Sequence, residues 1–206
     1  MAESNEAHWN QVYGSRAATD VSWYEAHPAR SLELIRATGI RSDEAIIDVG
    51  GGASILVEEL FGEGYRDLTI LDISAEALRT QRERLGRRGI VPTLIQEDVT
   101  RFRPQRSYAL WHDRAVFHFL VQPEDRLRYV DVLGRALRPG GHAIIATFGP
   151  SGPERCSGLS VARYDAQALA GELGAGFALI DSALHLHRTP RGAEQQFLYA
   201  RFDRRE

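Results

Sequence analysis

Two kinds of apolar pattern alternate along this chain. Short, nearly continuous apolar runs predict buried strands at 45–49, 67–71, 92–96, 107–111 and 142–148. Between and beside them, apolar residues at helical spacing predict helices over 28–38, 54–61, 76–85, 125–137 and 165–173. Strands that alternate with helices form βαβ units, so the pattern predicts an α/β fold with a parallel sheet covered on both faces.

The last two apolar runs, 177–187 and 196–202, are connected differently. Their link, 188–194, is too short for a crossover helix, and the two strands are therefore expected to pair as an antiparallel hairpin. Ser74 is expected to cap the helix that follows it, and the Arg-Pro-Gly-Gly sequence at 138–141 is expected to form a turn.

Composition and charge narrow the class of protein. The 206 residues carry 25 Lys and Arg against 28 Asp and Glu, a net charge of −3, which argues against nucleic acid as a partner. No run approaches the ~18 apolar residues of a membrane span, and the polar first residues lack the apolar region of a secretory signal. We expect a cytoplasmic monomer or homodimer, with an N-terminal aromatic arm (1–27) before one domain (28–206). The single cysteine excludes an intrachain disulfide, and no metal is expected.

A glycine-rich turn follows the first predicted strand. Gly50, Gly51 and Gly52 let the backbone turn sharply and approach a ligand, because glycine has no Cβ. The third glycine of a dinucleotide fingerprint is replaced by Ile55, and the Lys-Ser/Thr pair of a P-loop is absent. Asp48, just before the turn, would repel a pyrophosphate and suits a ligand that carries an amine.

Two further carboxylates follow the next two strands. Asp72 lies about 20 residues after the turn, where an acidic side chain accepts both hydroxyls of a ribose. Asp98 follows the third strand and can accept from the exocyclic amine of adenine. With Asp48, they match a ligand that has an amine, a ribose diol and a base but no phosphate, as S-adenosylmethionine does.

The motifs together resemble those of class I S-adenosylmethionine-dependent methyltransferases. They are Asp48-x-Gly50-x-Gly52, Leu-Asp-Ile-Ser at 71–74, Glu-Asp-Val at 97–99 and Leu-Arg-Pro-Gly-Gly at 137–141. The resemblance implies a Rossmann-like, doubly wound sheet of seven strands in the order 3-2-1-4-5-7-6, with strand 7 antiparallel. It implies S-adenosylmethionine as cofactor, with the glycine turn under its methionine part and Asp72 on its ribose. Ile73 and Val99, in the same motifs, join the cofactor-binding residues; Ser54 stands where many members have glycine.

The segment that follows the fourth strand, 111–120, stands where this fold sets acceptor specificity. Asp113 can orient the amine or the acceptor, and His118 is the first choice for a general base, because histidine titrates near neutral pH. His112 is a second base candidate and is assigned to the cofactor. For either histidine, a packed and hydrogen-bonded ring is the alternative. Further candidates for acceptor binding are Arg114, which can instead pair with an acid, and Phe117, which can instead lie in the core.

Other acceptor-binding candidates lie later in the chain. Cys156 belongs to a Gly/Pro/Ser-rich stretch typical of lids and binding loops, with an inert thiol as the alternative. His185 and His187 lie two residues apart on a strand, so both project from one face. We expect surface or interlayer histidines here, and a soft-metal or metalloid site formed with Cys156 and His118 is the alternative.

The N-terminal arm is rich in aromatic residues. Trp9 and Tyr13 form a W-x-x-x-Y pattern similar to the leading helix of several small methyltransferases, in which it covers the cofactor. Trp23 and Tyr24 are assigned to acceptor binding. Aromatic rings attract a sulfonium by cation–π interactions of about 0.5–2 kcal/mol. The alternative is that the tryptophans only fasten the arm to the sheet.

The sequence therefore predicts a methyltransferase that mainly aligns acceptor, methyl group and sulfur, and needs a base only for a protonated acceptor. The expected acceptor is a small molecule or small inorganic nucleophile such as a thiol, sulfide or metalloid. Protein-lysine N-methyltransferase is an alternative, since 111–120 also resembles small lysine methyltransferases, and a catalytically silent cofactor-binding module is another. A nucleic-acid methyltransferase is disfavoured by the acidic charge and by the missing Asn/Asp-Pro-Pro-aromatic motif.

Overall fold

A seven-stranded sheet forms the centre of the computed structural model, which describes residues 2–15 and 17–205. Its strands are β1 (Ile46–Val49), β2 (Leu68–Asp72), β3 (Thr93–Gln96), β4 (Tyr108–Arg114), β5 (Leu137–Phe148), β8 (Phe177–Arg188) and β9 (Glu194–Arg204). They lie in the order β3-β2-β1-β4-β5-β9-β8, with parallel pairs from β3 to β5 and antiparallel pairs on both sides of β9. Because β8 and β9 are the sixth and seventh strands of this sheet, the predicted order and the antiparallel last strand are confirmed.

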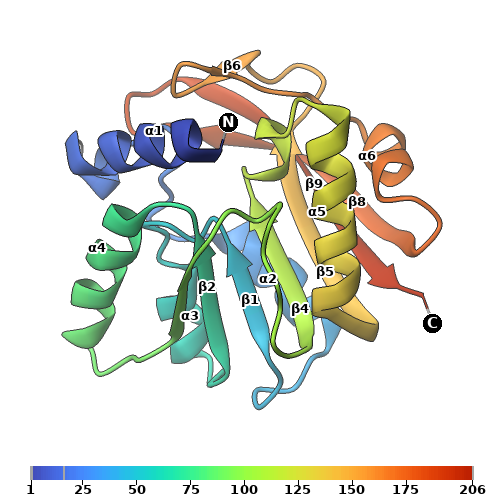
Figure 1. Cartoon of the computed structure of the whole chain (residues 1–206), viewed down its shortest axis with the longest axis horizontal. Helices are drawn as coiled ribbons and strands as arrows, with labels where there is room; N and C mark the ends of the chain where they lie inside the picture. The colour runs from blue at the N-terminus through green and yellow to red at the C-terminus, as the bar shows by residue number, and fades with distance from the viewer. Residues whose placement is uncertain (1, 16, 206) are drawn as a thin grey trace.

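Helices cover both faces of the sheet. They are α1 (Ala2–Ser15), α2 (Ala29–Thr38), α3 (Leu56–Gly62), α4 (Ala75–Gly86), α5 (Pro123–Ala136) and α6 (Ala166–Leu173), with 3-10 turns η1 (Ala18–Asp20) and η2 (Phe117–Phe119). Figure 1 shows α5 on the near face and α2 and α3 on the far face, while α1 lies across the carboxyl ends of the first strands. A two-stranded ribbon, β6 (Arg155–Cys156) and β7 (Leu159–Ser160), lies within the predicted loop after β5.

Two hydrophobic clusters, one on each face, hold the helices to the sheet. Tyr129 and Leu133 of α5 pack in one cluster, and Leu32 of α2 and Leu60 of α3 pack in the other. Alternate residues of β5 belong to the two clusters, which is the period expected of a strand covered on both sides. None of the helices in the described residues is long and apolar enough to cross a membrane.

Local signals in the sequence account for several element boundaries. The Ser74 hydroxyl accepts the N–H of Ala77 and caps α4 as predicted, and Gly39 ends α2 in the left-handed conformation. The predicted turn at 138–141 instead lies inside β5. Leu137 pairs with Tyr108 and His142 with Leu110, so residues 138–141 bulge out between two paired positions.

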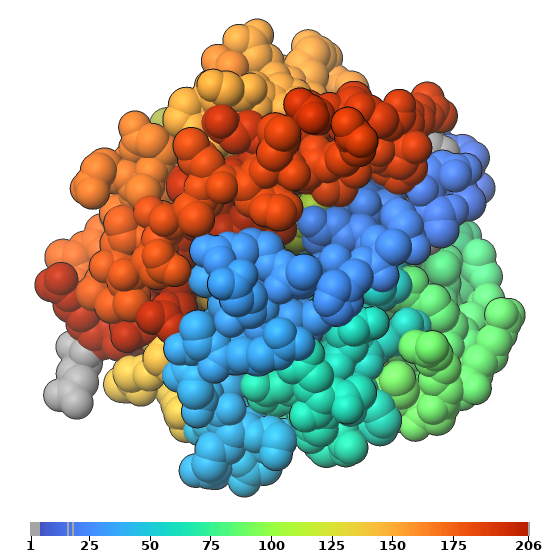
Figure 2. All heavy atoms as spheres, turned by 180° about the vertical axis from the view of Figure 1, so that it is seen from behind, coloured from blue at the N-terminus to red at the C-terminus, as the bar shows by residue number. Residues whose placement is uncertain are grey.

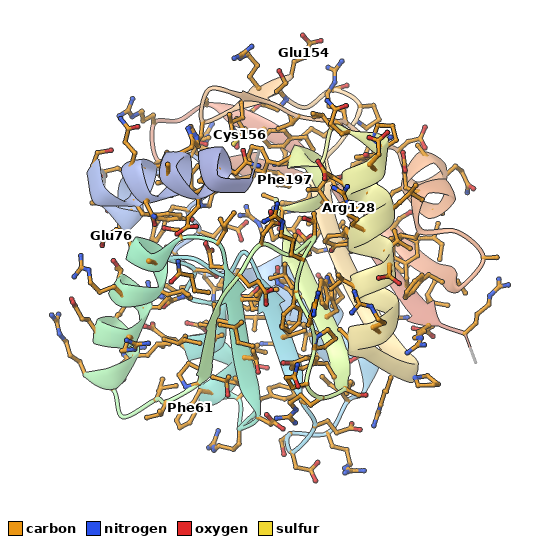
Figure 3. All side chains as sticks on the ribbon, in the orientation of Figure 1. Phe61, Glu76, Arg128, Glu154, Cys156 and Phe197 are labelled. Atoms are coloured by element: carbon orange, nitrogen blue, oxygen red, sulfur yellow. The ribbon has the colours of Figure 1, made fainter. Side chains whose placement is uncertain are left out.

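Segments from the two ends of the chain meet behind the sheet. Figure 2 shows the C-terminal strands beside the N-terminal part of the chain. The His187 ring donates to the Ser22 carbonyl at 2.7 Å, and Arg30 lies 3.8 Å from Asp181. In Figure 3, Cys156 and Phe197 lie at the end of the sheet that α1 covers, and Phe61 lies at the opposite end.

Candidate active site

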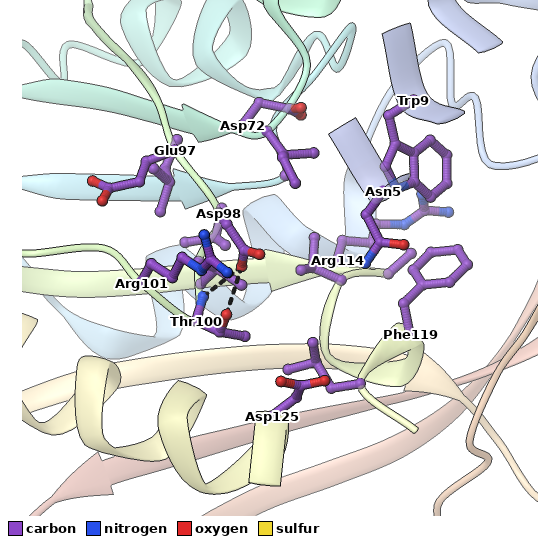
Figure 4. A pocket seen from close by; sticks show the side chains of 18 of the residues that line it. Asn5, Trp9, Asp72, Glu97, Asp98, Thr100, Arg101, Arg114, Phe119 and Asp125 are labelled. Atoms are coloured by element: carbon purple, nitrogen blue, oxygen red, sulfur yellow. Dashed lines mark hydrogen bonds between the residues drawn. The ribbon is translucent and has the colours of Figure 1, made fainter. Parts of the chain in front are cut away.

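A cavity of about 350 Å³ opens at the carboxyl ends of β1 to β4. Ligands bind at this edge of open α/β sheets where the strand order reverses, and here it reverses between β1 and β4. The volume falls in the range of small-ligand pockets, ~300–1,000 Å³. Figure 4 shows the cavity from close by. The sequence-predicted residues that line it are Trp9, Tyr13, Trp23, Gly50, Asp72, Ile73, Asp98, Val99, Arg114 and Cys156.

The glycine turn lies beneath the cavity and leaves no room for a side chain. Gly50 lines the larger cavity, whereas Gly52, which was assigned to the cofactor, lines neither cavity. Gly50 and Gly52 have φ values of +65° and +39°, in the left-handed region that favours glycine. A Cβ on Gly50 would collide with Val116, and a Cβ on Gly52 would lie 2.5 Å from the Tyr13 hydroxyl oxygen. The turn is therefore packed tightly beneath Val116 and Tyr13.

Asp72 lies at the end of β2 with its carboxylate at the cavity. Its Oδ1 accepts the N–H of Ser74 at 2.8 Å, which fixes the side chain. Burial raises the pKa of Asp72 to about 6, although N–H groups of Ser74 and Gly52 favour its charged form. A buried carboxylate held by backbone amides is well suited to accept two hydroxyl groups.

Asp98 lies at the end of β3, on the neighbouring part of the wall. Its Oδ1 accepts both the N–H and the hydroxyl of Thr100 at 2.8 Å (Figure 4). Both bonds use the same oxygen, so Oδ2 can accept from a ligand. Asp72 and Asp98 thus follow each other along the sheet edge, in the order that the sequence predicted.

Asp48 faces a smaller cavity of about 50 Å³ beside the first one. Its Oδ1 lies 2.7 Å from His112 Nδ1, and His112 Nε2 lies 2.9 Å from the Ser31 hydroxyl. Asp48 Oδ2 is buried and has no hydrogen-bond partner within residues 2–15 and 17–205. Trp23 and Gly50 line both cavities, so the smaller one continues the larger one over the end of β1.

An aromatic roof, made of Trp9, Tyr13, Trp23 and Phe119, closes the larger cavity. The ring of Trp9 meets those of Trp23 and Phe119 edge-on, with centroids 5.7 and 5.1 Å away, and Tyr13 meets Trp23 at 6.2 Å. Burial raises the pKa of the Tyr13 hydroxyl well above its ordinary value, so this group stays neutral. The roof combines α1, the segment before α2 and the turn after β4.

Residues 46–141 match a family model described as a methyltransferase domain. The chain contains a class I S-adenosylmethionine-dependent methyltransferase domain. S-adenosylmethionine is the cofactor of this class.

The names of curated relatives of the methyltransferase domain indicate different methyl acceptors. The mouse (Mus musculus) eEF1A lysine and N-terminal methyltransferase is 28% identical over 143 residues, which are 65% of this chain and 20% of that protein. Malonyl-[acyl-carrier protein] O-methyltransferase 2 of Ilyobacter polytropus is 24% identical over 153 residues, 72% of this chain and 56% of that protein. The chain thus spans between a fifth and just over half of the length of these two relatives.

Solved structures share the fold of the methyltransferase domain over nearly its whole length. A protein studied in the conversion of a disulfide bond into a thioacetal group during echinomycin biosynthesis has a TM-score of 0.80 at 19% identity, covering 97% of this chain and 91% of that chain. N-methyltransferase NodS from Bradyrhizobium japonicum WM9, in complex with S-adenosyl-l-homocysteine, has a TM-score of 0.72 at 18% identity, covering 96% and 98%. These identities show a common fold alone.

Two residues predicted to be catalytic in the methyltransferase domain lie outside both cavities. His118 is fully buried, and its Nδ1 accepts the N–H of Phe148 at 3.2 Å. Burial and the charge of Arg114 lower the pKa of His118 to about 3, so it is neutral and enclosed. The structure therefore argues against His118 as the general base, and the packed-ring alternative describes it.

Asp113 is the second of these residues. It is fully buried and accepts the Tyr129 hydroxyl at 2.6 Å and the N–H of Val116 at 2.9 Å. Its carboxylate therefore fastens the turn after β4 to α5 instead of orienting an acceptor. Successive residues of a strand point to opposite faces, and Asp113 points to the α5 side while His112 points toward Asp48 and Ser31.

His112 and Gly51 were assigned to the cofactor and line the smaller cavity instead of the larger one. Both ring nitrogens of His112 already face Asp48 and Ser31, so the ring offers no free nitrogen for proton abstraction from an acceptor. Tyr24, assigned to acceptor binding, also lines the smaller cavity.

Arg114 joins the two cavities and holds the roof in place. Its Nη1 donates to the Trp23 carbonyl at 2.8 Å, its Nε donates to the Tyr199 hydroxyl at 2.9 Å, and it pairs with Glu25 at 3.1 Å. The guanidinium also lies 4.7 Å from the centre of the Phe197 ring. The residue therefore lines the site, as predicted for acceptor binding, and pairs with an acid, which was its alternative.

The remaining candidates divide between the cavity and the core. Cys156 lines the cavity, and burial raises the pKa of its thiol to about 11, so the thiol is protonated at neutral pH. Phe117 is packed against Tyr129 with ring centroids 4.9 Å apart and lines neither cavity, which corrects its assignment to acceptor binding.

His185 and His187 lie on one face of β8 as predicted, yet outside both cavities. The His185 ring packs edge-on against Tyr199, and the buried His187 ring packs against Phe197. Within the part of the chain that the structure describes, no group of three or more His, Cys, Asp and Glu side chains is arranged to hold a metal ion. The suggested site that combined these histidines with Cys156 and His118 does not form.

Several lining residues were not expected from the sequence. Asp125 and Arg128 of α5, paired at 2.8 Å, line the cavity although their charged helix face resembles an ordinary solvated one (Figures 3 and 4). Phe119 also lines the cavity, although an aromatic residue in an apolar segment is typical of a core. The Asp-x-Thr spacing at 98–100 is a local signal that pointed to Thr100. The other unexpected lining residues are Asn5, Val49, Leu71, Glu97, Arg101, Ala115, Val116 and Leu120.

Proposed function

We propose that this domain transfers the methyl group of S-adenosylmethionine to a small-molecule nucleophile that binds beneath the aromatic roof. Bound cofactor supplies an activated methyl group on a positively charged sulfur. The protein then has to bind and align the two reactants and keep water away from them. Such alignment can contribute ~7–11 kcal/mol to lowering the barrier.

The cofactor fits the cavity in one direction along the sheet edge. Asp98 after β3 suits the adenine amine, and Asp72 after β2 suits the ribose hydroxyls. The methionine part then lies over the glycine turn after β1. There, the unpartnered Oδ2 of Asp48 is a buried acceptor that an ammonium group would satisfy.

The acceptor end follows next along the edge, over β4. Trp23, Phe119 and Cys156 surround it, and the aromatic faces favour a sulfonium while they exclude water. A positively charged sulfur at this end would lie among rings and a neutral thiol.

The side chains at this end of the cavity are poorly suited to abstract a proton from an acceptor. The Tyr13 phenol and the Cys156 thiol are neutral, and the Asp125 carboxylate is paired with Arg128. Glu97 lies across the cavity from Phe119 (Figure 4). This arrangement favours an acceptor that already presents a lone pair at neutral pH, such as a thiolate, sulfide or a metalloid, over a protonated lysine.

The aromatic enclosure of the acceptor end is the observation that carries this proposal. We expect that incubation with methyl-labelled S-adenosylmethionine and a panel of thiols, sulfide, metalloids and amines yields a small or volatile labelled product. The Trp23→Ala variant should lose about tenfold or more in kcat/KM, because the ring that covers the acceptor end is removed. Trp111→Phe, in the core and outside both cavities, is the matched control.

Two other outcomes would replace the proposal. Label in protein bands from a cell lysate would support protein-lysine methylation, to which the 28% identity with the mouse lysine and N-terminal methyltransferase also points. Cofactor binding without turnover on any acceptor would support a silent cofactor-binding module.

A further inference from the structure

A continuous chain of hydrogen bonds lies beneath the smaller cavity and ends at Asp48. It begins at the Ser31 hydroxyl, in the first turn of α2. Ser31 Oγ lies 2.9 Å from His112 Nε2, and His112 Nδ1 lies 2.7 Å from Asp48 Oδ1. Three elements contribute to this chain, α2, β4 and β1, so only the folded domain assembles it.

The donors in this chain have one consistent direction. A carboxylate oxygen accepts, so His112 Nδ1 carries the proton that is donated to Asp48 Oδ1. With its proton on Nδ1, the imidazole has an acceptor at Nε2, and the Ser31 hydroxyl donates to it. Each group in the chain therefore donates toward Asp48.

The result of this arrangement is seen at the second oxygen of Asp48. Asp48 is 2% exposed, and a carboxylate this buried is costly unless its charge is compensated. His112 satisfies Oδ1 only, so Oδ2 stays buried without a partner in the described part of the chain. The imidazole thus holds the carboxylate in one rotamer, with one oxygen left for a ligand.

We propose that His112 is a positioning residue that holds Asp48 as an oriented anion for the ammonium group of the cofactor's amino-acid part. The inference rests on the proposed function and deepens it. It assigns selectivity for the amino-acid part of the ligand to a histidine that does not touch the ligand. Ser31 acts one step further out, because its hydroxyl donates to Nε2 and thereby favours the tautomer of His112 that has its proton on Nδ1.

The order Ser–His–Asp is also that of a hydrolase triad, but the space around it does not suit that chemistry. Ser31 is 1% exposed, and the adjoining cavity of about 50 Å³ has no room for an ester or amide beside its hydroxyl. Ser31 is therefore a hydrogen-bond donor here and not a nucleophile.

Other charged groups near this chain are already paired or lie further along the cavity. Arg114 pairs with Glu25 at 3.1 Å, and Glu25 also lies 3.6 Å from the His187 ring. The negative charge of Asp48 helps to raise the pKa of Asp72. An ammonium group between Asp48 and Asp72 would relieve this repulsion between the two carboxylates.

Two probes separate the amino-acid part of the ligand from the rest. S-adenosylhomocysteine carries the ammonium, and 5′-methylthioadenosine has the same base, ribose and thioether without the amino acid. We would measure the Kd of each by calorimetry for wild type, Asp48→Asn, His112→Gln and His112→Asn. An Asn amide can replace the Nδ1 donor of His112, whereas a Gln amide extends to the place of Nε2 and leaves Asp48 without this donor.

We expect His112→Gln to weaken S-adenosylhomocysteine binding by about 10- to 100-fold, the usual cost of losing a charged hydrogen bond. Binding of 5′-methylthioadenosine should stay within about threefold. His112→Asn should stay within about threefold for both probes. Asp48→Asn should reproduce the loss of His112→Gln, and the double variant should lose no more than either one, because the two residues act in series.

A merely structural role for His112 would show itself in a different pattern. An equal loss for both probes in His112→Gln, or no recovery in His112→Asn, would overturn the inference. If His112→Gln does not fold, Ser31→Ala keeps the imidazole and should give a smaller loss, of about 3- to 10-fold, for S-adenosylhomocysteine only. A wild-type protein that binds neither probe would overturn the proposed function, whereas binding of both probes with equal affinity would overturn this inference alone.

Discussion

Three buried aspartates of this domain have similar chemistry and different neighbours. Asp113 has its oxygens occupied by Tyr129 and backbone N–H groups, so it acts as a fastener inside the core. Asp72 is held by a backbone amide and still faces the cavity. Asp48 accepts a hydrogen bond from His112 on one oxygen, and its other oxygen is buried without a hydrogen-bond partner among the described residues. What surrounds each carboxylate, and not its residue type, determines which of them can meet a ligand.

Ionisation of the Asp72 carboxyl should lower the free energy of unfolding of the ligand-free protein. Its pKa is raised to about 6 in the folded chain, against ~3.9 in an unfolded one, so its proton stabilises the fold below pH ~4 and this contribution is lost as the pH rises through 6. The free energy of unfolding of Asp72→Asn should therefore rise relative to that of wild type between pH 4 and 6, by on the order of 2–3 kcal/mol in total. Above pH 6 this difference between the two proteins should stay constant. Urea unfolding of both proteins from pH 4 to 8 measures this difference.

Asp72→Asn should weaken ligand binding, although it stabilises the ligand-free fold. The ionised carboxylate accepts the ribose hydroxyls, so wild-type affinity for S-adenosylhomocysteine should fall below pH 6, while the variant should bind weakly with a flatter pH profile. Asp113 also has a pKa raised to about 6, but it is present in both proteins and cancels in the comparison. Parallel stability curves for the two proteins would contradict this assignment.

At the scale of elements, helix α1 buries few apolar side chains against the core. Of its described side chains only Val12 is buried. The helix is fastened to α4 through Asn10, whose side-chain oxygen accepts from the Ser74 hydroxyl at 2.9 Å, and to β3 through Glu6, which accepts from Gln96 at 3.0 Å. A helix with few buried apolar contacts opens more easily than core strands. That α1 covers bound cofactor as a lid is therefore a proposal with a direct test.

Amide hydrogen exchange should find α1 among the faster-exchanging helices of the free protein and slow it on binding S-adenosylhomocysteine. A ligand beneath Trp9 and Tyr13 adds contacts to α1 that exist only in the closed arrangement. Asn10→Ala should raise exchange in α1 without ligand and leave β1 and β4 unchanged. An α1 that exchanges as slowly as those strands in both states would mean that it is a fixed wall.

Across the whole molecule, the site is assembled from segments that lie far apart in the sequence. The larger cavity takes residues from α1, the glycine turn, the ends of β2 and β3, the turn after β4, and β6. The sheet brings these segments together because its parallel strands end at one edge. An unfolded chain cannot form this cavity. The cytoplasmic location and the monomer or homodimer expected from the sequence stay predictions.

Ligand binding should therefore raise the unfolding temperature selectively. S-adenosylhomocysteine at 100 times its Kd stabilises a protein by ~2.7 kcal/mol, which corresponds to about 5–10 °C for a chain of this size. NADH and ATP should give no shift, since a pyrophosphate or triphosphate would lie against Asp48 and Asp72. A scan of melting temperature with each ligand measures the effect, and a shift with ATP or NADH equal to that with S-adenosylhomocysteine would contradict the phosphate-free site.

The apolar patterns predicted the strands of the sheet and the helices from residue 28 onward, the family resemblance implied the strand order, and local signals indicated part of the site. The ribbon of β6 and β7 and the bulge at 138–141 were not predicted. Apolar runs and helical spacing predicted the order of elements, and the glycine turn, Asp72 and Asp98 each follow directly from a strand end. These features depend on neighbours in the chain, so a pattern of residue types contains them. The placement of the Ser74 cap was predictable for the same reason.

Only the tertiary structure decided which chemically capable side chains reach the cleft. His118 and Phe119 are adjacent, yet the first is enclosed beside Phe148 and the second forms part of the roof. His112 of strand β4 contacts Ser31 of helix α2, a contact across 81 positions that no local pattern contains. Burial and hydrogen bonding across the chain depend on packing between elements, and this packing set the roles of the histidines that the sequence left open.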